Sequence, residues 1–273
     1  MDSREEIVMT VRVERSSRVL TVIHSRPEAR NAVDPEHAEA LYEAFLAFDK
    51  DDMADVAVFW GEGGAFCAGA DLKRVATRDN KKMRGLLDFP KDGGAIPRGP
   101  MGPSRLELSK PVIAAIEGPA VAGGMELALW ADCRVMAQDA YMGVYCRRWG
   151  VPLIDGGTVR LPRIVGQGRA LEIIMTGRKV EAEECLRIGL CEKVVPKGEA
   201  RQAAEEMAQE IARFPQACVR ADRRSVYLQQ GLTPRAALEQ EWINSIGVVE
   251  LEGAAGAARF AKGAGRHGDF GIE

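Results

Sequence analysis

Short apolar runs alternate with amphipathic stretches along most of the chain before residue 198. Two runs of alternating polarity, 7–14 and 18–24, flank Ser16-Ser17 and predict a β-hairpin. Runs rich in β-branched residues predict further strands at 56–60, 112–116, 133–137 and 191–195. Because helical patterns separate these strands, the chain is expected to be an α/β protein with a mostly parallel sheet.

Local signals mark where the first long helix begins and where the pattern breaks down. Asp34 has an N-cap side chain, Pro35 stands at the first helical position, and an amphipathic helix is expected to reach about Phe48. The stretch 79–104 is instead rich in Gly, Pro, Lys and Arg, with little periodicity beyond a short helix near Met83. Two interpretations stay open for it: a mobile loop over a functional site or an ordinary surface insertion.

The last part of the chain has helical periodicity throughout. Helices are expected at 200–214, 215–230 and 234–252. The pattern therefore divides the chain into an α/β core, residues 1–197, and a C-terminal helical region, residues 198–273. This region carries more large apolar residues, such as Trp242 and Ile243, than a helical end can bury on itself, so a homo-oligomer is expected.

Composition excludes several classes of function. The 273 residues carry 37 Lys and Arg against 40 Asp and Glu, so the formal charge of −3 gives no reason to expect nucleic acid as a partner. No apolar run is long enough to span a bilayer, and the polar, acidic N-terminus does not resemble a targeting peptide, so no membrane association is expected. The six cysteines form no Cys-x-x-Cys pair and indicate reduced thiols of a cytoplasmic protein.

Metal and nucleotide sites are not expected either. The three histidines, His24, His37 and His267, share no ligand spacing. The chain has no Gly-x-x-x-x-Gly-Lys run and no Gly-x-Gly-x-x-Gly after a strand, which argues against binding of nucleotide phosphates or nicotinamide.

Two turns of small residues carry the candidate chemistry. One, residues 65–72, follows the predicted strand 56–60, and the other, residues 118–127, follows the strand 112–116. Small side chains let the backbone approach a ligand closely, and the second turn opens a helix predicted from Gly124 to Ala131, whose first N–H groups favour negative charge. Two such N–H groups aimed at one carbonyl oxygen would form an oxyanion hole. Taken singly, each is also an ordinary strand-to-helix turn.

Together, the two turns resemble the paired signatures of the crotonase (enoyl-CoA hydratase/isomerase) superfamily. The likeness extends over nearly the whole chain, in the family's order and spacing, through the runs 25–32, 150–158, 161–166, 176–178, 181–182 and 189–191. The resemblance implies a ClpP/crotonase-like spiral of ββα units with a C-terminal helical region. It also implies that this region covers the active site and packs subunits as trimers, often paired into hexamers.

The resemblance further implies an acyl-CoA thioester as the ligand, with coenzyme A carried as part of the substrate and no separate cofactor. Carried over by position, the oxyanion donors are the backbone N–H groups of Ala68 and Gly123. Six residues in two short segments are implied to hold the CoA part: Glu28, Ala29, Arg30, Ala70, Asp71 and Leu72. Lys262 is implied to approach the CoA phosphates, although a solvated basic end is the alternative for it.

Hydratases of this family use two glutamates, and the chain departs from that pattern. The first matches Glu126, three residues after Gly123, but the position of the second holds Cys146. Asp155 is the nearest candidate for a second carboxylate, and the alternative for it is an N-cap of a helix beginning near Gly156. Cys146 is either a thiolate favoured by neighbouring arginines or a thiol that fills an apolar pocket.

These features predict an enoyl-CoA hydratase-like lyase that stabilises an enolate in an oxyanion hole. One alternative is another crotonase chemistry that needs a single carboxylate: isomerisation, decarboxylation or thioester hydrolysis. The alternative from a different class is a non-catalytic acyl-CoA-binding protein.

Overall fold

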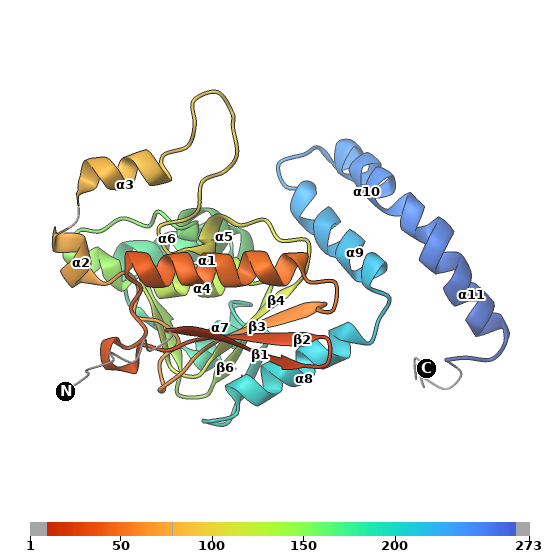
Figure 1. Ribbon diagram of the computed structural model, residues 1–273, viewed down its shortest axis with the longest axis horizontal. Helices are drawn as coiled ribbons and strands as arrows, with labels where there is room; N and C mark the ends of the chain where they lie inside the picture. Colours follow the sequence, from red (N-terminus) through yellow and green to blue (C-terminus); the bar gives the residue numbers. More distant parts are fainter. Residues whose placement is uncertain (1–9, 78, 266–273) are drawn as a thin grey trace, which may run out of the picture.

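A six-stranded sheet forms the centre of the molecule. The computed structural model describes residues 10–77 and 79–265, and the strand order in this sheet is β1-β2-β3-β4-β6-β9 (Figure 1). β1 and β2 form the predicted hairpin, and every other neighbouring pair in the sheet is parallel. The strands are β1 (Val11–Ser16), β2 (Val19–His24), β3 (Val56–Gly61), β4 (Val112–Ile116), β6 (Cys133–Ala137) and β9 (Lys193–Val195).

A second, three-stranded sheet has the order β5-β7-β8 and consists of β5 (Pro119–Val121), β7 (Tyr141–Gly143) and β8 (Lys179–Glu181). Both sheets lie among helices, so the α/β fold class is confirmed. The predicted strand at 191–195 is shorter than expected and begins at Lys193. Residues 7–9 of the predicted hairpin lie outside the described residues.

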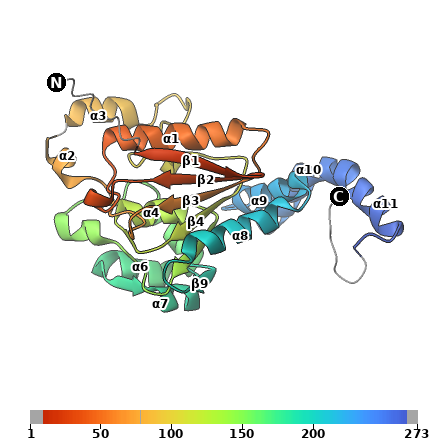
Figure 2. The same cartoon turned by 60° about the horizontal axis from the view of Figure 1, so that its bottom comes forward.

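Helices cover both faces of the main sheet. Figures 1 and 2 show α1 (Pro35–Lys50) on one face and α8 (Ala200–Ala212) on the other. All five residues of β4 are buried, as expected for a parallel strand covered on both sides. The predicted cap of α1 is confirmed, because the Asp34 carboxylate accepts a hydrogen bond of 2.8 Å from the His37 N–H.

The remaining helices of the core are short. The helix expected near Met83 is α3 (Asn80–Leu87), while α2 (Leu72–Thr77) was not predicted. Three single 3₁₀ turns, η1 (Pro27–Ala29), η2 (Pro103–Arg105) and η3 (Tyr145–Trp149), lie in the loops. The others are α4 (Gly123–Trp130), α5 (Gly157–Val165), α6 (Gln167–Thr176) and α7 (Ala182–Arg187).

The C-terminal helices form an arm beyond the sheet (Figure 1). α8 belongs to the core although it was placed in the region 198–273, because its buried alanines pack on the sheet. The arm begins with α9 (Gln216–Leu228), continues with α10 (Pro234–Val248), and ends with a π-helical turn, η4 (Val249–Gly253), and α11 (Ala254–Ala261). The single helix expected at 234–252 is therefore interrupted at Val249.

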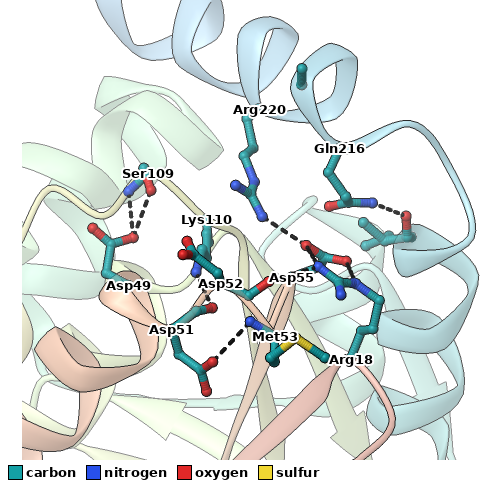
Figure 3. Close-up of polar contacts among 12 residues, drawn as sticks. Arg18, Asp49, Asp51, Asp52, Met53, Asp55, Ser109, Lys110, Gln216 and Arg220 are labelled. Carbon is teal, nitrogen blue, oxygen red and sulfur yellow. Dashed lines mark hydrogen bonds and ion pairs between the residues drawn. The ribbon is translucent and has the colours of Figure 1, made fainter. Parts of the chain in front are cut away.

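Ion pairs fasten the arm to the core. Asp55, which is buried before β3, accepts hydrogen bonds from Arg18 and from Arg220 of α9, the latter at 2.8 Å (Figure 3). One turn further along α9, Arg223 Nε donates to Asp132 at 2.8 Å.

Within residues 10–77 and 79–265, no helix has both the length and the apolar character required to cross a membrane.

Candidate active site

The two small-residue turns lie side by side. The Cys67 N–H donates to the Pro119 carbonyl at 3.0 Å, and the Val121 N–H donates to the Cys67 carbonyl at 2.9 Å. A Cβ atom on Gly124 would lie 2.1 Å from the Cys67 carbonyl oxygen, and one on Gly69 would lie 3.1 Å from the Gly123 nitrogen. Glycine is therefore required at these contacts, which explains the composition of both turns.

The second turn reaches its helix through an unusual backbone conformation. Ala122, the residue before α4, has φ 54° and ψ −125°, a region that residues with a side chain rarely adopt. Its N–H donates to the Gly143 carbonyl of β7 at 2.8 Å, so the neighbouring strand holds it in place. Gly123 is then the first residue of α4, where an N–H group has no partner within the helix.

The structure corrects the expected oxyanion donor in the first turn. The Ala68 N–H donates to the Arg30 carbonyl at 3.0 Å and is not available to a ligand. Asp71, two residues beyond Gly69, donates to the Val33 carbonyl, and the alternation of an extended chain turns the Ala70 N–H to the opposite side. The N–H groups of Ala70 and Gly123 both donate to no acceptor within the described residues. Ala70 thus replaces Ala68 as the candidate donor.

The two segments expected to hold the CoA part are neighbours. The Val33 N–H donates to the Gly69 carbonyl at 2.8 Å, and Arg26 pairs with Asp71 at 3.2 Å. Of the residues that the sequence singled out here, Glu28, Arg30 and Leu72 are exposed, while Ala29, Ala70 and Asp71 are half-buried.

Lys262 does not join these segments within one chain. It is exposed directly after α11, and Figures 1 and 2 both show that helix at the far end of the arm, away from α2 and α4. Within a single subunit, the structure therefore does not bring Lys262 to the predicted CoA site.

Glu126 lies in the first turn of α4 and is buried, with 3% of its surface exposed. Its Oε1 accepts hydrogen bonds from the N–H groups of Asp155 and Gly157, at 2.9 and 2.8 Å. Among the described residues, no group donates a hydrogen bond to the other carboxylate oxygen, Oε2. This oxygen is not fully enclosed by protein atoms. Burial, followed by the charge of Asp155, raises the pKa of Glu126 to about 7. The residue can therefore gain and lose a proton near neutral pH.

Asp155 does not take the helix-capping role that was the alternative for it, and its role as a second carboxylate stays a prediction. Its Oδ1 accepts hydrogen bonds from the Met101 N–H at 2.9 Å and from the Ser104 hydroxyl, so that oxygen is already occupied. It does not cap a helix, because α5 begins at Gly157, its N-cap position is Gly156, and the side chain that accepts a hydrogen bond from Gly157 is Glu126. Burial raises the pKa of Asp155.

Met101 and Ser104 are site residues that sequence reasoning missed. They lie in the stretch interpreted as a loop, where the dipeptides Gly99-Pro100 and Gly102-Pro103 are a signal for tight turns. That signal predicts local geometry, but it cannot show that the turns contact Asp155, more than fifty residues further along the chain.

Cys146 lies in η3 and is buried. Burial, and next the charge of Glu126, raise the pKa of its thiol, so the thiolate alternative is not supported. The neighbouring arginines are engaged elsewhere: Arg148 stacks over Tyr145 at 3.6 Å, and Arg147 donates to the Ile174 carbonyl. The structure favours a neutral thiol that fills space beside Glu126.

Over the described ranges, no group of three or more acidic, His or Cys side chains could hold a metal ion.

Comparison with known proteins agrees with this geometry. Residues 14–252 match the sequence model of the family described as enoyl-CoA hydratase/isomerase. The chain belongs to this family. It is 35% identical over 221 residues to "Enoyl-CoA hydratase EchA19" of Mycobacterium tuberculosis, covering 78% of this chain and 79% of that protein. It is 37% identical over 199 residues to "Carnitinyl-CoA dehydratase" of Salmonella typhi, covering 72% of each.

Solved structures of this family share the fold. A crystal structure of an enoyl-CoA hydratase from Mycobacterium tuberculosis superposes with a TM-score of 0.83 at 32% identity, covering 93% of this chain and 96% of that one. The crotonase fold expected from the resemblance is confirmed, and the family's named members are enzymes, which places this chain among enzymes.

Proposed function

We propose that this chain is an enoyl-CoA hydratase-like lyase that adds water to the double bond of a 2-enoyl-CoA. The observation that carries the proposal is the buried Glu126, with one oxygen held by two N–H groups and the other open, on the helix that begins with the free N–H of Gly123. The family membership and the names of the relatives support the same substrate class.

In the proposed reaction, the Glu126 carboxylate takes a proton from water as the water oxygen bonds to Cβ. The electron pair of the double bond moves to the thioester oxygen, where the N–H groups of Ala70 and Gly123 stabilise the enolate. Glu126 then returns the proton to Cα and releases a 3-hydroxyacyl-CoA. Because Cys146 stands where the second glutamate was expected, one carboxyl group performs both proton transfers in this scheme.

The remaining assignments of the site belong to this proposal. The segments 28–30 and 70–72 hold the CoA part, which arrives with the substrate, so no separate cofactor is required. Their proximity through Val33 supports this role. We assign the enzyme to the cytoplasm on the basis of its six free cysteines, four of them buried.

We propose that the enzyme is a homotrimer or a pair of trimers. Large apolar side chains on α10, Leu238, Trp242 and Ile243, are each between 63% and 66% exposed in the single chain and need a partner surface. In such an assembly, Lys262 would reach the CoA site of another subunit. Size-exclusion chromatography with light scattering tests this proposal, and a monodisperse species near the 29.7 kDa of one chain would contradict it.

A second candidate is another crotonase reaction that needs only one carboxylate, such as double-bond isomerisation, and the neutral Cys146 beside Glu126 favours it. In the decisive assay, the purified protein is incubated with crotonyl-CoA. The loss of the substrate's enone absorbance measures turnover, and mass spectrometry identifies the product. The proposal predicts 3-hydroxybutyryl-CoA from the wild type and hardly any from Glu126→Gln. If a panel of 2-enoyl-CoAs is unchanged while a 3-enoyl-CoA is converted, isomerisation replaces hydration. If every acyl-CoA binds and none reacts, the protein is a binding protein.

A further inference from the structure

Asp155 is a buried acid that the proposed reaction does not use, although it lies beside Glu126. Its backbone N–H donates to Glu126 Oε1 at 2.9 Å, while its carboxylate accepts hydrogen bonds from Met101 and Ser104. One residue therefore connects the proposed proton-transfer group to the segment 99–104.

That segment in turn contacts the proposed oxyanion site. Gly99 and Gly102 exchange two backbone hydrogen bonds, of 3.0 and 2.9 Å, which form a tight turn with Met101 near its tip. The Met101 side chain packs on the start of α4, because a Cβ atom on Gly123 would lie 2.8 Å from its Sδ. Space is tighter still at Gly99, where a Cβ atom would lie 1.8 Å from Ser104 Oγ and 3.0 Å from Asp155 Oδ1. The Asp155 carboxylate thus holds in place a turn that packs against Gly123.

The charges around the two acids are unequal. Arg160 of α5 is close to both acids and clamps the loop, donating to the Asp155 carbonyl at 3.0 Å and to the Ser104 carbonyl at 2.7 Å. The other titratable neighbours are Cys146, which faces Glu126, and Arg105 and Cys67, which face Asp155. Burial raises the pKa of both thiols, so they are neutral. Arg105 and Arg160 both favour the charged form of Asp155, and Arg160 also favours that of Glu126.

We assign the negative charge to Asp155, because it has both arginines beside it, while burial acts in the opposite direction and raises its pKa. The negative charge of Asp155 raises the pKa of Glu126, second only to burial, and each of the two acids accepts two hydrogen bonds that favour its ionised form. Burial and this charge together raise the pKa of Glu126 to about 7, so Glu126 keeps its proton up to about that pH.

We propose that Asp155 is a positioning residue of this site: it locks the segment 99–104 against Gly123, and its charge sets the pH range in which Glu126 works, without exchanging a proton with the substrate itself. The proposal rests on the proton-transfer role given to Glu126 under the proposed function.

Asp155→Asn separates charge from geometry, because the amide oxygen keeps an acceptor for Met101 and Ser104 while the charge is removed. The test is an isotope-edited NMR titration of the glutamate side-chain carboxyl groups, in which Glu126→Gln identifies the Glu126 signal. No substrate is needed. We expect the Glu126 midpoint to fall by about one pH unit in Asp155→Asn, as the loss of a nearby like charge requires. An unchanged midpoint would overturn the electrostatic part of the proposal.

Kinetic pH profiles with crotonyl-CoA form the second arm. In Asp155→Asn, kcat at its own optimum should stay within about tenfold of wild type, with the profile moved to lower pH. Loss of turnover at every pH in a folded Asp155→Asn protein would show that Asp155 transfers a proton and would contradict its positioning role.

Ser104→Ala is the matched control and also serves if Asp155→Asn fails to fold. It keeps the charge of Asp155 and removes one hydrogen bond of the turn, so the Glu126 midpoint should stay near the wild-type value while kcat falls severalfold. A midpoint shifted as far as in Asp155→Asn, or an unchanged kcat, would refute the separation of the two roles. If the wild type converts no acyl-CoA, the proposed function fails, and the titration still decides whether Asp155 controls Glu126.

Discussion

Glu126 with Asp155 and His24 with His37 are two pairs of buried titratable side chains, and they differ in how their polar atoms are satisfied. Glu126 accepts two hydrogen bonds on one oxygen and Asp155 accepts two on one of its own. His24 and His37 lie in the core with ring centroids 5.5 Å apart, and none of their four ring nitrogens forms a hydrogen bond among the described residues. Burial lowers the pKa of His24 to about 3 and that of His37 to about 4.

Burial alone therefore does not indicate function. Both pairs have strongly shifted pKa values, which is a common property of active sites. His24 packs against the rings of Phe59, Phe66 and His37, and both histidines are neutral and behave as core residues. The carboxyl pair differs because Glu126 keeps an oxygen open and lies beside free N–H groups, so its protonation can be used by a ligand.

The largest expected effect follows from replacing the functional acid. Glu126→Gln should lower kcat by about 10²-fold or more, with a smaller effect on acyl-CoA binding, because it removes the proton-transfer group. The folded-state pKa of about 7 lies above the ordinary 4.5, so the wild type loses stability as the pH rises through this window. At pH about 8, the free energy of unfolding of Glu126→Gln should therefore exceed that of wild type by on the order of 1–3 kcal/mol, and the variant should unfold at a higher urea concentration.

Steady-state kinetics with crotonyl-CoA and urea unfolding at two pH values measure both effects. If Glu126→Gln turned over substrate as fast as wild type, the carboxyl pair would be structural, like the histidine pair, and the proposed difference between the two pairs would be wrong. A variant that is both inactive and less stable at pH about 8 would indicate that packing, and not charge, dominates at this position.

The histidine pair should give the opposite pattern: unchanged activity and altered acid stability. Its folded-state pKa values lie below the ordinary 6.5, so the unfolded chain binds more protons and stability falls as the pH decreases below about 6.5. Each histidine contributes up to about 1.4 kcal/mol per pH unit to this slope. His24→Met should reduce the slope between about pH 6.5 and 4 and leave kcat within about twofold of wild type. Urea titrations across that range measure it, and an unchanged slope would show that other groups govern acid unfolding.

The smallest effect is expected at the thiol beside the carboxyl pair. Because Cys146 is buried and neutral, Cys146→Ser should change kcat by less than about threefold and shift the pH profile little. Kinetic pH profiles of this variant and of wild type make the comparison. A loss comparable to that of Glu126→Gln would give the thiol a role in the reaction and would extend the functional group beyond the two acids.

The sequence predicted the elements whose signals are local. The cap at Asp34, the hairpin, most strands and the two small-residue turns depend on neighbours in the chain, and the structure has them close to the expected positions. The choice between Ala68 and Ala70 depends on the direction of a single N–H, which is set by a hydrogen bond to Arg30. No pattern of residue types carries that direction.

Long-range contacts account for the rest. The role of Asp155 is decided by Met101 and Ser104, which reach it only after the chain has folded. Likewise, α8 has the pattern of the C-terminal helices, but its alanines make it part of the core, because small side chains let it approach the sheet closely.

The position of the thioester oxygen in a crystal structure of the protein with a bound acyl-CoA tests the proposed oxyanion hole most directly. We expect this oxygen to lie about 3 Å from the nitrogens of both Ala70 and Gly123, with Glu126 Oε2 facing the Cα–Cβ bond. A thioester oxygen bound away from these two N–H groups, or a Glu126 turned away from the acyl chain in every subunit, would contradict it.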